Sequence, residues 1–180
     1  MLLSCSAEAA QFPVDIIFVV DASASIGSVI FAQAKLFVSQ MIDYFDIDSG
    51  LVRVGACSYS VSVTSSFNLS DHTTRVAVKT AVLSLVYSGG SADLAAVLKF
   101  VRTTMLTSAA GDRINVFNII VILTDGPSSD PLGVQVSPTR QLFVTLLADN
   151  QNERPQCSLR CSVYFNILLK DNQTFQLHYI

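Results

Sequence analysis

Residues 14–20 read Val-Asp-Ile-Ile-Phe-Val-Val, an almost continuously apolar run that ends directly at Asp21. A run this short and apolar is typical of a strand that is covered on both faces of a sheet. Residues 117–123, Phe-Asn-Ile-Ile-Val-Ile-Leu, repeat the pattern, and Asp125 follows two positions later. Such strands belong to parallel sheets between layers of helices, so the two runs favour the α/β class.

Patterns of strand and helix alternate along the rest of the chain, which is the order found in doubly wound sheets. A core strand is predicted at 51–59, and a short, half-polar strand at 62–67 is predicted to pair with it as an antiparallel edge. Helices are predicted at about 28–45, at 92–105 and around 139–150. A further helix is predicted to begin at a cap formed by Ser70-Asp71 and to end at about residue 86, and the last clear strand is predicted at 162–169. We therefore expect a doubly wound, mainly parallel central sheet with one antiparallel edge strand and helices on both faces.

Length and composition agree with one globular domain. The chain has 180 residues, of which 51% are hydrophobic and 14% charged, and this composition excludes general disorder. The net charge is −3 and the sequence has no basic stripe, which argues against nucleic-acid binding. The longest apolar runs are far shorter than the roughly 20 residues of a membrane-spanning helix. We expect an N-terminal extension at 1–11, in which Met1-Leu2-Leu3 hints at a signal remnant, and one domain at 12–180.

Asp21, Ser23 and Ser25 lie on one tight loop at the carboxyl end of the first predicted strand. Ligands of open α/β sheets bind where the chain leaves the carboxyl ends of the strands. Carboxylate and hydroxyl oxygens suit Mg²⁺ or Mn²⁺ better than zinc, which prefers nitrogen and sulfur. Asp125 follows the second run and Ser91 precedes a predicted helix, so both can join the same site. The alternative is local, because Asp and Ser also cap helices and form turns.

Three short motifs in chain order carry a family resemblance: Asp21-x-Ser23-x-Ser25, Gly89-Gly90-Ser91 and Thr124-Asp125-Gly126. Together they resemble the metal-ion-dependent adhesion site (MIDAS) of the von Willebrand factor type A domain, the fold of integrin I domains, over roughly residues 12–170. The resemblance implies Mg²⁺ or Mn²⁺ held by Asp21, Ser23, Ser25, Ser91 and Asp125, with an open position for an Asp or Glu carboxylate of a protein partner. The implied function is cation-dependent adhesion within a larger matrix or cell-surface protein, the partner being a matrix protein such as collagen, or a receptor.

The chain departs from the family pattern in three places. Ser91 stands where the family usually has Thr, a change that keeps the hydroxyl oxygen. Asp93 stands where a second Thr is frequent; it either modulates the site with an extra carboxylate, which would repel an acidic ligand, or caps the following helix. Only eleven residues follow Leu169, so we expect the closing helix of the family to be missing from this sequence, with a C-terminal end that is either truncated or diverged.

Cysteines and glycosylation sequons bear on the compartment. By resemblance to secreted family members, Cys5 is expected to pair with Cys157 or Cys161, whereas Cys57 is expected to be reduced and buried in a strand. Zinc binding by Cys157-x-x-x-Cys161 is a weaker interpretation, because neither histidine lies at a finger-like spacing. The sequons at Asn68 and Asn172 are candidate glycosylation sites. We expect an extracellular or secreted protein.

Enzymatic functions find little support in the sequence, and we expect that the protein is not an enzyme. Neither the Gly-x-Gly-x-x-Gly of dinucleotide-binding folds nor the Gly-Lys-Ser/Thr of a P-loop is present. The best enzymatic alternative is a Mg²⁺-dependent phosphatase-like protein, because Asp21 and Asp125 at strand ends suit metal-assisted catalysis. The other alternative is a structural matrix domain that binds no metal in service.

Overall fold

The computed structural model describes residues 13–124, 143–149 and 163–166, with only the backbone described in the last two ranges. The described strands form one sheet in the order β3-β2-β1-β4-β5-β6. Their bounds are β1 Val14–Asp21, β2 Val52–Tyr59, β3 Val63–Phe67, β4 Phe117–Thr124, β5 Phe143–Asp149 and β6 Val163–Asn166. The described α-helices are α1 Gly27–Met41, α2 Arg75–Leu83 and α3 Leu94–Phe100, with single turns at Ile42–Tyr44, Val101–Met105 and Ser108–Ala110.

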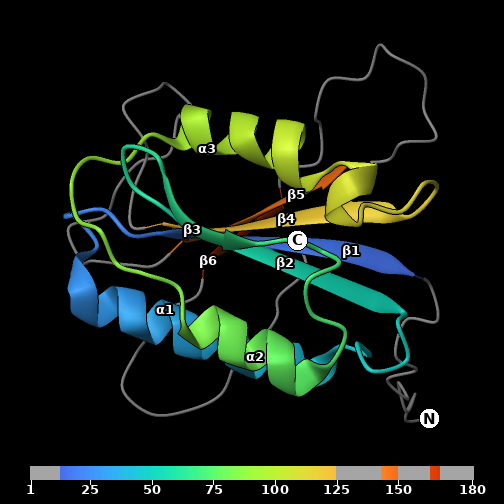
Figure 1. Cartoon of the computed structure of the whole chain (residues 1–180). Coiled ribbons are helices and arrows are strands. Elements are labelled where there is room, and N and C mark those ends of the chain that lie inside the picture. Colours follow the sequence, from blue (N-terminus) through green and yellow to red (C-terminus); the bar gives the residue numbers. More distant parts are fainter. Residues whose placement is uncertain (1–12, 125–142, 150–162, 167–180) are drawn as a thin grey trace, which may run out of the picture.

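The central part of the sheet has the predicted arrangement. β1 lies between β2 and β4 and is parallel to both, with Val14 opposite Val52 on one side and Phe117 on the other. β3 pairs with β2 in antiparallel orientation, as expected of the edge strand. Helices α1 and α2 cover one face of the sheet, and α3 covers the other (Figure 1). The α/β fold class predicted from the sequence is confirmed. The expected single antiparallel edge is corrected, because the pairs β4–β5 and β5–β6 are antiparallel as well as β2–β3.

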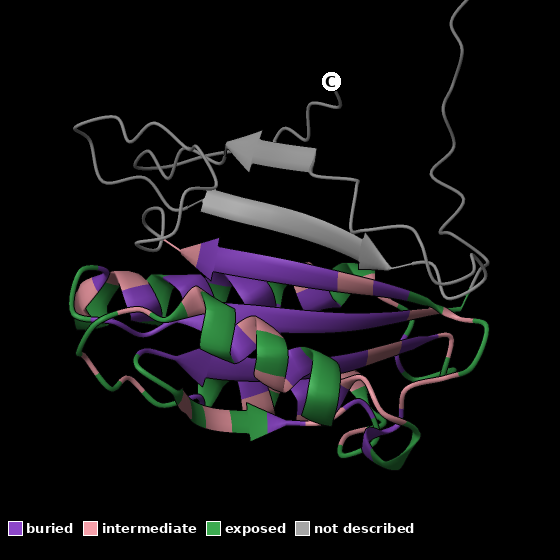
Figure 2. Ribbon diagram, turned by 90° about the horizontal axis from the view of Figure 1, so that it is seen from above, coloured by how far each residue is buried: buried purple, intermediate pink, exposed green. Residues whose placement is uncertain are grey.

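Alternate residues of β1 build two cores on opposite faces of the sheet. Phe18 and Val20 pack toward α1 and α2, where Ala34 and Val38 of α1 are fully buried. Val19 lies in the core on the α3 side of the sheet, whose other fully buried residues include Ile17, Cys57, Val97, Val101 and Met105. Figure 2 shows the three central strands almost entirely buried. Burial on both faces explains why the strand sequences are continuously apolar.

The structure corrects two element predictions. Residues 143–149 form strand β5, antiparallel to β4, and not the helix expected around 139–150. The segment Phe-Val-Thr-Leu-Leu-Ala is nearly all apolar, so its periodicity does not distinguish a strand from a buried helix. The free side of β4 decides the outcome, because its backbone N–H and C=O groups need a neighbouring strand as a partner.

The start of α2 is the second correction. The predicted cap at Ser70-Asp71 is wrong, because the Asp71 carboxylate instead accepts a hydrogen bond from the backbone N–H of Asn68 at 2.7 Å and closes a turn. The helix begins later in the chain, at Arg75. Its cap is Thr74, whose hydroxyl accepts from the backbone N–H of Ala77 at 3.3 Å. It ends at Leu83, before the expected end near residue 86.

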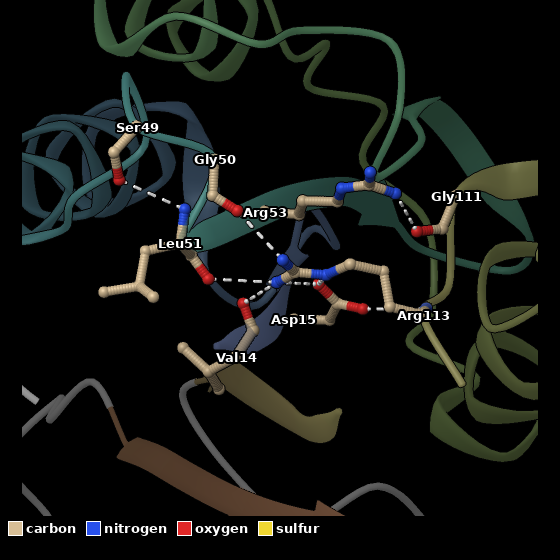
Figure 3. A network of polar contacts seen from close by, with 8 residues as sticks. All are labelled: Val14, Asp15, Ser49, Gly50, Leu51, Arg53, Gly111 and Arg113. Carbon is tan, nitrogen blue, oxygen red and sulfur yellow. Dashed lines mark hydrogen bonds and ion pairs between the residues drawn. The ribbon is translucent and has the colours of Figure 1, made fainter. Parts of the chain in front are cut away.

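An ion pair fastens the sheet at the amino ends of its parallel strands. Asp15 is fully buried, and its carboxylate lies 2.7 Å from the Arg113 guanidinium. Arg113 also donates to the backbone carbonyls of Val14, Gly50 and Leu51 at 2.9 to 3.0 Å (Figure 3). Every group of this network has a partner, which is what allows a charged pair to lie inside a sheet.

No helix in the described part of the chain is both long enough and apolar enough to cross a membrane.

Candidate metal-binding site

Asp21 ends β1 at the carboxyl edge of the central strands, and its side chain is held in a fixed direction. The residue is only 1% exposed. One carboxylate oxygen accepts from the backbone N–H of Ser23 and the other from the Thr124 hydroxyl, both at 2.8 Å. The first bond comes from the loop after β1, and the second comes from the end of the neighbouring parallel strand, because Thr124 ends β4. The carboxylate is therefore oriented before any ligand arrives.

Ser23 and Ser25 follow on the same loop, which we call the first site loop (residues 21–25). Their hydroxyl oxygens lie 3.0 Å apart and are hydrogen-bonded. Ser23 is buried, at 1% exposure, whereas Ser25 is exposed. The loop then turns through Gly27, whose φ of +72° favours glycine, into helix α1. One carboxylate and two adjacent hydroxyls are thus gathered on five residues, as the sequence predicted.

A second site loop (residues 88–93) lies against the first. The backbone N–H of Gly89 donates to the Ala22 carbonyl at 2.9 Å, and the N–H of Ala24 donates to the Gly90 carbonyl at 2.8 Å. Gly89 and Gly90 have φ of +69° and +82°, which other residues rarely adopt. Ser91 comes directly after this pairing and is exposed. The structure therefore brings the loop that carries Ser91 to the loop that carries Ser23 and Ser25.

Asp93 caps helix α3. Its carboxylate oxygen accepts from the backbone N–H of Ala96 at 2.9 Å, which is the second of the two roles considered for this residue. The Asp93 side chain is exposed to solvent.

Several predicted residues lie outside the described residues. They are Asp125 of the metal set, the candidate disulfide cysteines Cys5, Cys157 and Cys161, and the candidate glycosylation residue Asn172. The position before Asp125 is known, since Thr124 contacts Asp21. Asn68 lies half-buried in the turn before α2.

Cys57 has the predicted character of a buried, reduced side chain. It is a free thiol on β2 with no exposed surface. Burial raises the pKa of the Cys57 thiol from 9.0 to about 12, because the apolar surroundings disfavour the thiolate. Cys57 therefore offers no thiolate ligand to a metal.

The donor set fits a hard divalent cation. The polar groups that face one another are carboxylate and hydroxyl oxygens, and these are the ligands of Mg²⁺ and Mn²⁺. Among the described residues, no three His, Cys, Asp or Glu side chains gather in one place, so a nitrogen- or sulfur-rich zinc centre has no counterpart there.

Three residues of this region were not predicted as part of the site. Thr124 orients Asp21, and Ser60 and Ser88 connect the second site loop to the sheet. Thr124 stood beside a predicted ligand in the sequence, but its role depends on the register between β1 and β4. Neither Ser60 nor Ser88 belongs to a motif that the sequence analysis used.

Comparison with known proteins decides the family. The family model described as the von Willebrand factor type A domain matches residues 15–145. The chain belongs to this family. The domain is 37% identical to the collagen alpha-4(VI) chain of Mus musculus over 120 residues, which are 66% of this chain and 5% of that protein. It is 28% identical to matrilin-1 of Homo sapiens over 144 residues, which are 80% of this chain and 29% of that protein.

Solved structures agree with the sequence relatives. Proximal thread matrix protein 1 from the mussel byssus is similar with a TM-score of 0.61 and 28% identity, over 67% of this chain and 32% of that chain. A second structure of that protein, with a zinc-occupied MIDAS motif, has a TM-score of 0.58 and 25% identity, over 69% of this chain and 33% of that chain.

The relatives place the domain outside the cell. Collagens and matrilins are extracellular-matrix proteins, and the expected extracellular location is confirmed by them. These relatives are matrix proteins and not enzymes. The domain matches only 5% to 29% of the length of the two relatives described above, so their other parts have no counterpart in it.

Proposed function

We propose that the domain is a cation-dependent protein-binding module of the extracellular matrix. Mg²⁺ or Mn²⁺ would be held by Asp21, Ser23, Ser25, Ser91 and Asp125. The partner is a protein that presents an Asp or Glu carboxylate, and we propose a matrix protein such as collagen or a cell-surface receptor. The observation that carries the proposal is the buried, pre-oriented Asp21 beside two hydroxyls 3.0 Å apart.

The charges of the site residues support a carboxylate as the partner's group. When bound, the cation would supply a coordination position that a partner oxygen can occupy. Of the proposed ligands, Ser23, Ser25 and Ser91 are neutral. Asp21 and Asp125 together would balance the charge of a divalent cation if both bound it directly. If either carboxylate bound the cation through water, part of the positive charge would remain to attract a carboxylate of the partner. The exposed Ser25 and Ser91 leave the outer side of the site open to a partner.

The zinc-occupied site of the mussel protein supports a divalent metal in this family and leaves its identity open for this domain. Most protein sites bind Zn²⁺ more tightly than Mn²⁺, so zinc in one structure does not define the metal used in the matrix. We infer Mg²⁺ or Mn²⁺ from the oxygen donors of this chain.

Calorimetric titration of Mg²⁺, Mn²⁺ and Zn²⁺ into the purified domain tests the metal site. We expect binding by the natural sequence and none by Asp21→Asn, which keeps the shape of the side chain and removes its charge. Asp125→Ala should also abolish binding, with little loss of stability. Asp43→Asn is the matched control, because Asp43 is an exposed carboxylate that pairs with Lys79 on the helical side. Identical titrations for the natural sequence and Asp21→Asn would leave only a structural matrix role.

Adhesion is tested separately with immobilised collagen. We expect attachment of the domain in Mn²⁺, its loss on chelation with EDTA and its loss in Asp21→Asn. Attachment that persists in EDTA would show that the partner is bound by another surface and would contradict the bridging role of the cation.

A further inference from the structure

We propose that Ser88 and Ser60 are positioning residues that fix the second site loop, and with it Ser91, against the first. The effect on metal affinity rests on the function proposed above, whereas the effect on the loop does not. The inference comes from a set of serine and threonine hydroxyls at the end of β2 and β3 that no part of the metal site uses.

The chain between α2 and the second site loop is held to the sheet by side chains. The backbone N–H of Val86 donates to the Ser65 hydroxyl at 3.0 Å, and its carbonyl accepts from the Ser58 hydroxyl at 2.9 Å. The two hydroxyls lie 2.8 Å from each other, on the paired strands β2 and β3. The hydroxyls of Ser58 and Ser65 thus satisfy the backbone N–H and carbonyl of Val86, as a neighbouring strand does for a residue within a sheet.

Ser88 continues this attachment at the start of the loop. Its hydroxyl donates to the Ser60 hydroxyl at 3.0 Å and accepts from the Thr64 hydroxyl at 3.0 Å. The carbonyl of Ala22, in the first site loop, lies 3.5 Å from the same hydroxyl. A serine hydroxyl has one proton and two lone pairs, so these contacts use most of its capacity.

Ser60 holds both ends of the second site loop. Its hydroxyl accepts from Ser88, and its backbone carbonyl accepts from the N–H of Asp93 at 2.8 Å. Ser60 is itself buried, at 7% exposure. Ser91 lies between these two attachment points, on a stretch that begins with two glycines. Glycines restrict the backbone least, so the attachment points and the pairing with the first loop determine where Ser91 lies.

Removal of the Ser88 hydroxyl should loosen the loop without disturbing any proposed ligand. A typical intramolecular hydrogen bond changes an equilibrium by about 3- to 10-fold. We therefore expect the backbone N–H groups of Gly89 and Ala24 to exchange with solvent about 3- to 10-fold faster in metal-free Ser88→Ala. Ser88→Thr keeps the hydroxyl and should retain protection. Ser66→Ala is the control, because it removes an exposed hydroxyl from β3. It should leave the exchange of both N–H groups unchanged.

Hydrogen exchange of these two amides, measured by NMR, decides the loop-positioning role. Unchanged exchange in both Ser88→Ala and Ser60→Ala would overturn it, whether or not the domain binds a metal. Faster exchange in Ser66→Ala to the same degree would also overturn it, because the effect would then be general to the sheet edge.

The metal arm measures the dissociation constant of Mn²⁺ by calorimetry. We expect Ser88→Ala and Ser60→Ala to weaken Mn²⁺ binding by about 3- to 10-fold and Ser88→Thr to restore it. A purely structural role would lower the melting temperature of the metal-free protein and leave the dissociation constant unchanged. If the natural sequence binds no Mn²⁺, the proposed function fails, and the exchange measurement still decides whether these serines position the loop.

Discussion

Asp21 combines two properties that rarely occur together at a surface site. It is almost fully buried, yet within the described part of the chain its carboxylate is bonded only to neutral donors, the Ser23 N–H and the Thr124 hydroxyl. An ionised carboxylate inside a protein is stabilised chiefly by a positive partner. The proposed cation would be that partner, and this explains why Asp21 and not the exposed Asp93 is the centre of the candidate site.

Asp93→Ser separates the two roles of residue 93. Serine keeps the cap on α3 and removes the charge, so we expect the Mn²⁺ dissociation constant to change by less than about 2-fold, as for an exposed charge in water. The measurement is calorimetry beside Ala95→Ser, which alters another exposed residue in the first turn of α3 without touching a charge. A marked gain in the affinity for a carboxylate ligand would instead assign Asp93 a repulsive role at the site.

Cys57 should be inert in the folded protein. Its thiol pKa of about 12 keeps it protonated at about pH 8, and its side chain is buried. Alkylation at that pH, followed by mass spectrometry of the peptide that contains Cys57, should label it only in denaturant. Because the thiol ionises near 9.0 in the unfolded chain, the stabilising contribution is present below pH 9.0 and is lost as the pH rises toward 12. Rapid labelling under native conditions would contradict its burial.

At the scale of elements, the approach of α1 to the end of α2 supports the second site loop from the helical side. The Lys35 ammonium donates to the carbonyls of Leu83 and Leu85 at 2.7 and 2.9 Å. It also lies 5.1 Å from the centre of the Phe31 ring, which contacts Tyr87. A cation at a helix C-terminus satisfies carbonyls that have no partner within the helix. The chain that leaves α2 is therefore directed toward β2 before it reaches Val86.

Lys35→Met should lower the free energy of unfolding by about 1 kcal/mol, because it removes the charge and both hydrogen bonds but keeps the apolar stem. Chemical denaturation beside Lys99→Met, an exposed lysine on α3, measures the effect. The control should change stability by less than about 0.5 kcal/mol. Equal losses in the two variants would mean that Lys35 contributes only as a surface charge.

At the scale of the whole molecule, the two ends of the parallel strands have different tasks. The carboxyl ends carry the site loops, and the amino ends carry the network around Asp15 and Arg113 (Figure 3). The Arg113 side chain joins the loops that precede β2 and β4 to the first residues of β1. This end therefore fixes the strand register on which the contact between Asp21 and Thr124 depends at the other end.

Arg113→Met should destabilise the domain by about 3 to 5 kcal/mol, because it leaves the buried Asp15 carboxylate without a charge partner. Equilibrium unfolding in urea measures the change. Arg102→Met removes an exposed arginine and should cost less than about 1 kcal/mol. Asp15→Asn combined with Arg113→Met should recover part of the loss, and a failure to do so would show that the carbonyl contacts of Arg113 matter more than its charge.

The sequence by itself predicted the strands at 14–20 and 117–123, the antiparallel edge, the helix that begins near residue 28 and the loop that gathers Asp21, Ser23 and Ser25. These features are local, since they depend on periodicity and on spacing within a few residues. The family resemblance followed from three such short motifs, and the comparison with known proteins confirmed it. Asp125 and the cysteine pairing lie outside the described residues and stay predictions.

Only the tertiary structure decided which of two locally acceptable structures each remaining segment adopts. Residues 143–149 form a strand because β4 offers an open side, and Thr74 caps α2 because Asp71 is already used in a turn. Likewise, the pairing of Asp15 with Arg113 and the contact of Ser60 with Ser88 join residues 98 and 28 positions apart. Such contacts depend on strand register and on the packing of neighbouring elements, which no local pattern of side chains encodes.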